Sequence, residues 1–205
     1  MLQIDTLRLG SLRTNCYVVR KADSSACVVI DPGDEPEHVA AFLKEKGLSL
    51  EAILLTHGHF AHVGGVQALA EATGCALWLS ESDWSQTPSP FVLQLFPIIN
   101  CDFCTVNFPE EGETIRAAGL SFRVHATPGH TSGSVCYECE DCLFTGDTLF
   151  CGSCGRTDLP GGSHTAMAGS LTRLRNLPGD FRVFPGHGKA TTLALEKQEN
   201  PYMQP

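Results

Sequence analysis

The sequence lacks a run of the roughly 18 apolar residues that a membrane-spanning helix needs, and residues 1–15 lack a basic segment followed by an apolar one. We therefore expect a cytoplasmic protein with no signal peptide and no membrane partner. Basic residues are also scarce, because 14 Lys and Arg stand against 23 Asp and Glu, which gives a net charge of −9. The few basic residues form no tract, so nucleic acid is not an expected partner, since its phosphates would be repelled on average.

Cysteine, in contrast, is plentiful, with ten residues in the chain. Without an export signal, reduced thiols are the default. Three groups have the two-residue gap of a metal or redox pair: Cys101 with Cys104; Cys136, Cys139 and Cys142; and Cys151 with Cys154. A second metal site or an occasional disulfide stays open. The favoured interpretation is that cysteines in strand-like segments such as "SVCYE" act as small hydrophobic residues.

The chain of 205 residues, 42% of them apolar, suits one domain with a substantial core over residues 1–205. Apolar and β-branched segments alternate with helical patterns, which predicts an α/β or α+β fold. The predicted strands are 2–9, 15–20, 26–31, 50–57, 75–80, 114–117, 120–127, 134–138, 142–145 and 180–188. The predicted helices are 34–47, 64–74 and 163–177.

Two of these helices have cap signals at their first residues. Asp34 with Glu37 is typical of a capping box, and Ser163 is the expected cap of the helix that follows it. Residues 81–112 are irregular and proline-rich, so we expect a short helical piece and a long apolar loop. In that loop, Phe91, Leu95 and Phe96 are candidates for a substrate wall or for plain core packing.

The segment "LLTHGHFAHVGG" (54–65) places three histidines within six residues. His57 and His59 point the same way as the chain leaves an extended strand, because side chains alternate along a strand. His62 follows just after the turn. Three converging imidazoles repel one another when protonated, and a metal cation removes that conflict. The cluster therefore predicts a metal site.

Further candidate ligands each follow an apolar strand and lie next to glycine or proline. His130 lies in "TPGHTSGS", Asp147 in "LFTGDTLF" and His187 in "VFPGHG". A lone residue of this kind is more often structural, but the repeated context favours a shared site. Ligands at strand ends indicate a site at the edge of a pair of sheets.

These segments, together with "VIDPG" and "GSCGRTDLPGG", span essentially the whole chain in an order that resembles the metallo-β-lactamase superfamily, in particular its single-domain glyoxalase II-like (hydroxyacylglutathione hydrolase-like) members. The resemblance implies an αββα sandwich with metals at its edge. It implies that the first metal is held by His57, His59 and His130, and the second by His62 and His187, with Asp147 bridging the two. Asp31 would organise the loop behind the ligands.

The chain departs from the family pattern His-x-His-x-Asp-His at Ala61. The missing aspartate would ligate the second metal and orient the bridging water, so we expect the second site to be weakened. Two explanations stay open. Ala61 is a deliberate inactivating replacement, which the intactness of every other motif residue favours, or the chain is a natural variant that works with one metal or has lost activity.

The resemblance implies a metal-dependent hydrolase, most simply a thioesterase for small acyl thioesters. Bound metal would lower the pKa of water from about 16 to about 7 and supply hydroxide for attack on the carbonyl. Zinc is the default, as one or two ions, with iron or manganese as alternatives. The alternative functions are a lactonase or esterase, a persulfide dioxygenase with one iron, and a non-catalytic binding protein. Glyoxalase II itself carries an additional helical domain that binds glutathione. Here the sandwich is expected to end near Thr192 and to leave only a short tail, so a full glutathione site is not assumed.

Overall fold

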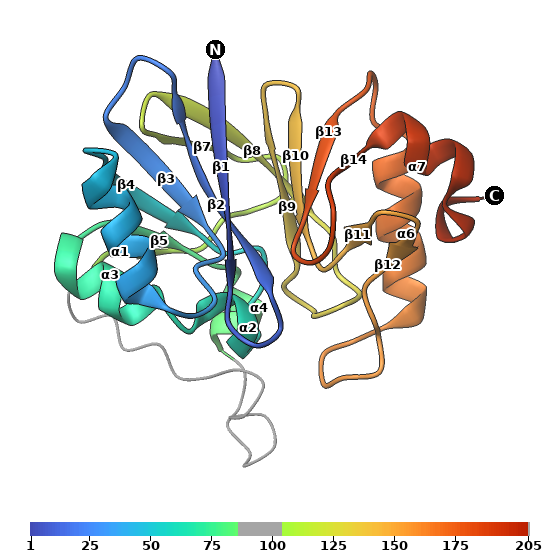
Figure 1. The fold of residues 1–205 in the computed structure, drawn as a ribbon. Helices are drawn as coiled ribbons and strands as arrows, with labels where there is room; N and C mark the ends of the chain where they lie inside the picture. The colour runs from blue at the N-terminus through green and yellow to red at the C-terminus, as the bar shows by residue number, and fades with distance from the viewer. Residues whose placement is uncertain (86–103, 205) are drawn as a thin grey trace.

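Two six-stranded β-sheets lie face to face in the computed structural model, which describes residues 1–85 and 104–204 (Figure 1). In spatial order, the first sheet contains β1 (Leu2–Leu9), β2 (Thr14–Lys21), β3 (Ala26–Ile30), β4 (Ser49–Leu54), β5 (Ala76–Trp78) and β6 (Val106–Asn107). The second contains β14 (Thr191–Thr192), β13 (Arg182–Pro185), β10 (Cys142–Gly146), β9 (Val135–Cys139), β8 (Leu120–Ala126) and β7 (Thr114–Ala117). A separate hairpin pairs β11 (Leu149–Phe150) with β12 (Ser153–Cys154).

Helices cover the two outer faces of this pair of sheets (Figure 1). The first sheet is covered by α1 (Pro36–Glu45) and α3 (Val66–Thr73), and the second by α6 (His164–Arg175) and α7 (Leu193–Glu199), followed by the 3₁₀ turn η1 (Pro201–Met203). The short helices α2 (Phe60–Val63) and α4 (Glu81–Trp84) lie near one end of the sheets. The layers run α, β, β, α, which confirms the predicted αββα sandwich.

Three apolar clusters hold these four layers together. One lies between the first sheet and helices α1 and α3, one between the two sheets, and one between the second sheet and helices α6 and α7. Strand β2 contributes to two of these clusters. Its Cys16 and Val18 belong to the outer cluster, whereas its Tyr17 and Val19 belong to the central one. Because successive side chains point to opposite faces, the part of a strand that is covered on both sides is a continuous apolar run.

Backbone hydrogen bonds also join the two sheets directly at one edge. The Val135 amide donates to the Thr56 carbonyl, and the Asn15 amide donates to the Gly186 carbonyl, each at 2.8 Å. Two buried tyrosines add to these bonds, as the Tyr17 hydroxyl donates to the Pro185 carbonyl at 2.6 Å and the Tyr137 hydroxyl donates to the Leu55 carbonyl at 2.8 Å. The sheets are therefore fixed relative to each other at the edge where the histidine loops emerge.

The predicted helices are present with shorter bounds, but one predicted cap is wrong. Helix α1 has Glu35 as its N-cap residue, with a left-handed φ of 48° and no side-chain cap bond. The carboxylate of Asp34 instead accepts from the Glu35 amide at 2.8 Å, and that of Glu35 accepts from the Gly10 amide. The capping-box prediction fails because Glu35, not Asp34, is the N-cap residue, and the Asp34 side chain is engaged outside the helix. Ser163 caps α6 as predicted, accepting from the Ala166 amide.

The segment after Thr192 is more structured than the sequence analysis expected. Helix α7 begins there with Thr192 as its cap, accepting from the Leu195 amide at 3.3 Å. Leu193 is fully buried and Met203 is nearly so, in the cluster beneath the second sheet. The prediction of a short tail is wrong because these apolar side chains complete the outer layer of the sandwich.

The described cysteines are free, and most pack as hydrophobic residues. Cys136 lies in the outer cluster of the second sheet, and Cys139 and Cys142 face each other across the β9–β10 turn in the central cluster. Burial raises the pKa of all three thiols to about 12, which keeps them protonated rather than as metal-binding thiolates. Among the described residues, the groups with metal-site geometry are made by histidines and Asp147.

Parts of the expected apolar loop, including Phe91, Leu95, Phe96 and Cys101, lie outside the described residues. The short helical piece expected near its start is present as α4. Within residues 1–85 and 104–204, no helix combines the length and the apolar character needed to cross a bilayer.

Candidate metal centre

The loops that carry the six candidate ligands meet at one edge of the sandwich. Strand β8 is antiparallel to β9, β9 is antiparallel to β10, and β10 is parallel to β13. The carboxyl ends of β8, β10 and β13 therefore share an edge, where His130, Asp147 and His187 follow. Strand β4 of the first sheet ends opposite, and its loop carries His57, His59 and His62. The topology thus brings together residues that are up to 130 positions apart (57 to 187).

His57, His59 and His130, here called the first set, form a compact group of buried imidazoles. One ligand nitrogen from each lies within 4.8 Å of the others. Nδ1 of His59 and Nε2 of His130 are 2.8 Å apart, and the ring of His57 lies 4.8 Å from each of the other two ring centroids. Each side chain is at most 5% exposed. The arrangement offers three nitrogen ligands converging on one point.

The hydrogen bonds behind this set fix which nitrogen faces the centre. Nδ1 of His130 donates to the Arg156 carbonyl at 2.8 Å, which leaves Nε2 as the lone-pair nitrogen. Nδ1 of His57 lies 3.1 Å from Oγ1 of Thr56, and that hydroxyl donates to Oδ2 of Asp31 at 2.7 Å. Since the hydroxyl proton is committed to Asp31, Thr56 accepts from His57 and directs its Nε2 inward.

Asp31 lies directly behind the centre and holds several of these groups. Its Oδ1 accepts from the Thr56 amide at 2.8 Å, and its Oδ2 accepts from Nδ1 of His62 at 2.9 Å. The residue is 1% exposed and has a left-handed φ of 51°, which aims its carboxylate at the turn after β4. One buried carboxylate therefore orients His62 directly and His57 through Thr56.

Asp147 lies between the first set and a second set made of His62, His187 and Asp147 itself. Its Oδ1 is 3.5 Å from Nε2 of His62, and its Oδ2 is 3.5 Å from Nε2 of His130 and 3.6 Å from Nε2 of His187. His187 is the most exposed of the imidazoles at 29%, and its Nδ1 donates to the Leu12 carbonyl. The position of Asp147 suits a carboxylate shared between two cations.

Ala61 lies in α2, directly before His62. It borders a small cavity of about 30 Å³ that is also lined by Leu12, Asp34 and Phe60. Such a volume accommodates about one water molecule. Because an alanine side chain offers no ligand atom, the second set has two imidazoles and one shared carboxylate. The first set keeps three imidazoles and the same carboxylate.

The electrostatics of the centre favour the neutral form of His57 and His59. Burial, reinforced by the neighbouring histidines, holds the pKa of His57 well below its usual range, and burial with His130 and His62 lowers that of His59 to about 3. Burial also opposes charge on His62, but the carboxylates of Asp147 and Asp31 raise its pKa. Neutral imidazoles are the form that binds metals.

The buried polar atoms at this centre show that a cation fits. Among the described residues, Nε2 of His57, Nε2 of His62 and Oδ1 of Asp147 are buried without a hydrogen-bond partner. Unpartnered buried polar atoms are costly and rare in proteins. A divalent metal coordinated by these nitrogens and oxygens satisfies all three, and imidazole with carboxylate suits zinc, iron or manganese.

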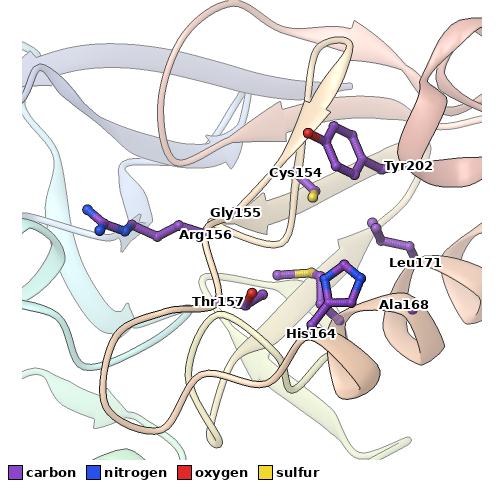
Figure 2. Close-up of a pocket in the computed structure, with 9 residues that line it drawn as sticks. Cys154, Gly155, Arg156, Thr157, His164, Ala168, Leu171 and Tyr202 are labelled. Atoms are coloured by element: carbon purple, nitrogen blue, oxygen red, sulfur yellow. The ribbon is translucent and has the colours of Figure 1, made fainter.

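A cavity of about 530 Å³ lies beside residues 154–157, where the Arg156 carbonyl accepts from His130 (Figure 2). Helix α6 and η1 form its far wall, and its lining includes Cys154, Met167, Leu171 and Tyr202. Figure 2 shows the Arg156 side chain pointing away from the other labelled side chains, on the opposite side of this segment.

Sequence reasoning missed one buried acid that contacts the ligand loops. Asp83, in α4, is 4% exposed and accepts a 2.8 Å bond from the amide of Gly58, between His57 and His59. It follows "LWLSES" in a segment without a recognisable site motif. The one available signal was an acid beside Trp84 in an otherwise polar, serine-rich segment, which is too common to be specific.

Comparison with known proteins agrees with this architecture. Residues 9–187 match the family model of the metallo-beta-lactamase superfamily. The hydroxyacylglutathione hydrolase GloC of Haemophilus influenzae is 34% identical over 98% of both chains, and the probable metallo-hydrolase YqgX of Bacillus subtilis is 32% identical over 95% of this chain and 94% of its own.

Solved structures are also similar over nearly the whole chain. The B3 metallo-beta-lactamase BLEG-1 has a TM-score of 0.88 at 33% identity and covers 99% of this chain and 100% of its own. TTHA1623, solved in a di-iron-bound form, has a TM-score of 0.84 at 40% identity, over 97% of this chain and 99% of its own. From the shared fold, the matched family model and these full-length similarities, the chain belongs to the metallo-beta-lactamase superfamily.

Proposed function

We propose that this protein is a metal-dependent hydrolase acting on small acyl thioesters, with its second metal position impaired by Ala61. The observation that carries the proposal is the convergence of four histidines and Asp147 in two compact groups that share His57, with His187 beside Asp147 and with buried ligand atoms that lack protein partners. The similarity to a hydroxyacylglutathione hydrolase supports a thioester as the substrate. A bound metal would supply Lewis-acid chemistry, acidifying water and polarising a carbonyl.

The residues of the chain prepare the centre for that chemistry. Asp31, Thr56 and the Arg156 carbonyl fix the tautomers of three histidines, so their lone pairs face the same point without rearrangement. Asp147 is placed to bridge the two sets and to accept a proton from a water molecule held between them. Burial of the first set keeps bulk water out of this region and strengthens the electrostatic interactions within it.

Apolar side chains at the rim support a small acyl group as part of the substrate. Leu12 and Phe60 are 53% and 43% exposed, and both border the cavity beside Ala61. The Leu12 carbonyl also accepts from His187, so this loop lies directly beside the second set. An acyl chain packed on Leu12 and Phe60 would place its carbonyl near Asp147.

Other parts of the proposal rest on composition. A small-molecule substrate, without nucleic acid or a membrane as partner, agrees with the net charge of −9. Free thiols such as Cys75 and Cys104 agree with a cytoplasmic location, where thiols stay reduced. Zinc is the proposed metal, and the di-iron form of TTHA1623 makes iron the first alternative to test.

The test compares this chain with an Ala61→Asp variant, each loaded with zinc or with ferrous iron. We expect the variant to hydrolyse at least one thioester in a panel of acyl thioesters, lactones and simple esters, at a higher rate than the parent chain. Oxygen consumption with a persulfide would instead indicate the dioxygenase alternative. Tight ligand binding without turnover in both proteins would indicate a binding protein, and either result would overturn the thioesterase proposal.

A further inference from the structure

Asp83 is a buried carboxylate whose hydrogen bonds all reach loops of the candidate metal centre. Its Oδ2 accepts from the Gly58 amide and from the Thr131 hydroxyl, each at 2.8 Å, and its Oδ1 accepts from the Gly133 amide at 3.0 Å. The side chain projects from the single-turn helix α4, which Ser80 caps through the Ser82 amide. Three acceptor bonds satisfy a carboxylate that burial would otherwise make costly.

The partners of Asp83 alternate with the ligands of the first set along the chain. Gly58 separates His57 from His59, and Thr131 directly follows His130. The histidine loop comes from the first sheet and the His130 loop from the second, so one carboxylate links the two loops across the sandwich. The relative position of the three imidazoles therefore depends on this link.

The packing around Asp83 shows that the link is close and specific. A β-carbon on Gly133 would lie 2.6 Å from Oδ1 of Asp83, so a side chain at that position would force the carboxylate away. The Thr131 hydroxyl also lies 2.8 Å from Oγ of Ser134, which holds it in the orientation that serves Asp83. The Thr131 donor is thus held by Ser134 as well as by Asp83.

We propose that Asp83 is a positioning residue of the first set, holding the His57–His59 loop against the His130 loop at the separation that a metal ion requires. The inference rests on the metal-binding part of the proposed function. It adds a residue outside the ligand motifs and assigns its effect to the three-histidine set. Asp31 and the Arg156 carbonyl orient individual rings, whereas Asp83 sets the distance between loops.

Glu196 provides a matched control for an effect on stability alone. It is 2% exposed and also accepts three hydrogen bonds, from the Gly152 amide at 2.8 Å, the Thr191 hydroxyl at 2.7 Å and the Asn200 amide nitrogen at 2.8 Å. Its partners belong to the β11–β12 turn, to strand β14 and to the C-terminal end of α7. Replacing Glu196 removes an equally bonded buried carboxylate without touching the two histidine loops.

The experiment measures zinc affinity by competition with a chromophoric chelator for the parent protein, Asp83→Ala, Asp83→Asn and Glu196→Ala. Since Ala61 weakens the second set, the first equivalent of metal reports the first set. We expect Asp83→Ala to bind about 10- to 100-fold more weakly than the parent, as for other residues that orient metal ligands. Asp83→Asn retains one acceptor oxygen and should lose less, and Glu196→Ala should stay within about twofold of the parent, as expected for independent sites.

Two further measurements separate positioning from loss of folding. The visible absorption band of the cobalt-loaded protein should change for Asp83→Ala and not for Glu196→Ala. Thermal unfolding of the metal-free proteins should show comparable destabilisation for both. If Asp83→Ala does not fold, Asp83→Asn and Thr131→Val take its place, and both must weaken zinc binding.

The outcomes distinguish this inference from the proposed function. Unchanged zinc affinity in the Asp83 variants, or an equal loss in Glu196→Ala, would overturn the positioning role while leaving metal binding intact. A parent protein that binds neither zinc, cobalt nor iron would overturn the proposed function itself, together with this inference.

Discussion

Ala61 is the residue at which the sequence departs from the pattern that the resemblance implies. Asp147 lies 3.5–3.6 Å from ligand nitrogens of His62, His130 and His187. A methyl group at position 61 contributes no charge, so the second set must hold a cation with two imidazoles and a shared carboxylate. The weakness that we propose for the second set is therefore local, and a single side chain should repair it.

We predict that Ala61→Asp raises both metal content and hydrolytic rate. The added carboxylate supplies the missing anionic ligand, and we expect second-metal affinity to rise by about 10- to 100-fold, the range seen when groups supporting a metal are changed. Metal analysis after dialysis should show close to two ions per chain. Ala61→Asn has nearly the same shape without the charge, and equal metal retention in the Asn and Asp variants would contradict the prediction.

Some residues of the centre could be predicted from the sequence, and Asp83 could not. The sequence predicts His57, His59 and His62 because they cluster within six positions. It also predicts His130, Asp147 and His187, because each follows an apolar strand beside glycine or proline. Asp83 could not be predicted from the sequence, because its contacts with Gly58, Thr131 and Gly133 form only when the two sheets pack together.

At the scale of elements, most strands and the long helices were predictable, whereas the two-residue strands were not. Strands β2 and β4 contain apolar segments, Cys16–Val19 and Ala52–Leu54, because both faces are covered there, and α6 has a clear cap at Ser163. Helix α1 was found, but its cap was misassigned, because the Asp34 side chain bonds outside the helix and Glu35 is the N-cap residue. Strands β6, β11, β12 and β14 have two residues each, which is too short for a periodic pattern.

Helix α7, missed from the sequence, should matter for stability. Leu193 is fully buried in the cluster beneath the second sheet, so Leu193→Ala should lower the free energy of unfolding by about 2–5 kcal/mol. Leu195, two residues along the same helix and 40% exposed, is the control, and Leu195→Ala should cost less than about 0.5 kcal/mol. Urea titrations measure both, and equal losses would show that α7 does not pack as described.

The tyrosine that bonds across the two sheets gives a second test at this scale. Tyr137 is fully buried in β9, and its hydroxyl donates to the Leu55 carbonyl beside the histidine loop. Tyr137→Phe leaves that carbonyl unpaired in the core and should cost about 1–3 kcal/mol of unfolding free energy. Tyr202→Phe, at a half-exposed position in η1, should be nearly neutral, and a similar loss there would argue against a specific inter-sheet bond.

At the scale of the whole molecule, the metal centre and the joint between the sheets occupy the same edge. The Val135–Thr56 and Asn15–Gly186 backbone bonds lie within a few residues of the ligands. A cation bound by both sets would cross-link loops from the two sheets. Metal binding should therefore stabilise the fold as a whole, because the ligands are separated when the chain unfolds.

We predict that removing metal with a chelator lowers the melting temperature, and that zinc restores it in a concentration-dependent way. Zinc at 100 times its dissociation constant should add about 2.7 kcal/mol to the free energy of unfolding, because it binds the folded state alone. Magnesium at the same concentration should add almost nothing, since imidazole nitrogens are poor ligands for it. Scanning calorimetry over a zinc series measures the effect, and equal shifts with magnesium would mean that general ionic effects, not ligation by the histidines, stabilise the joined edge.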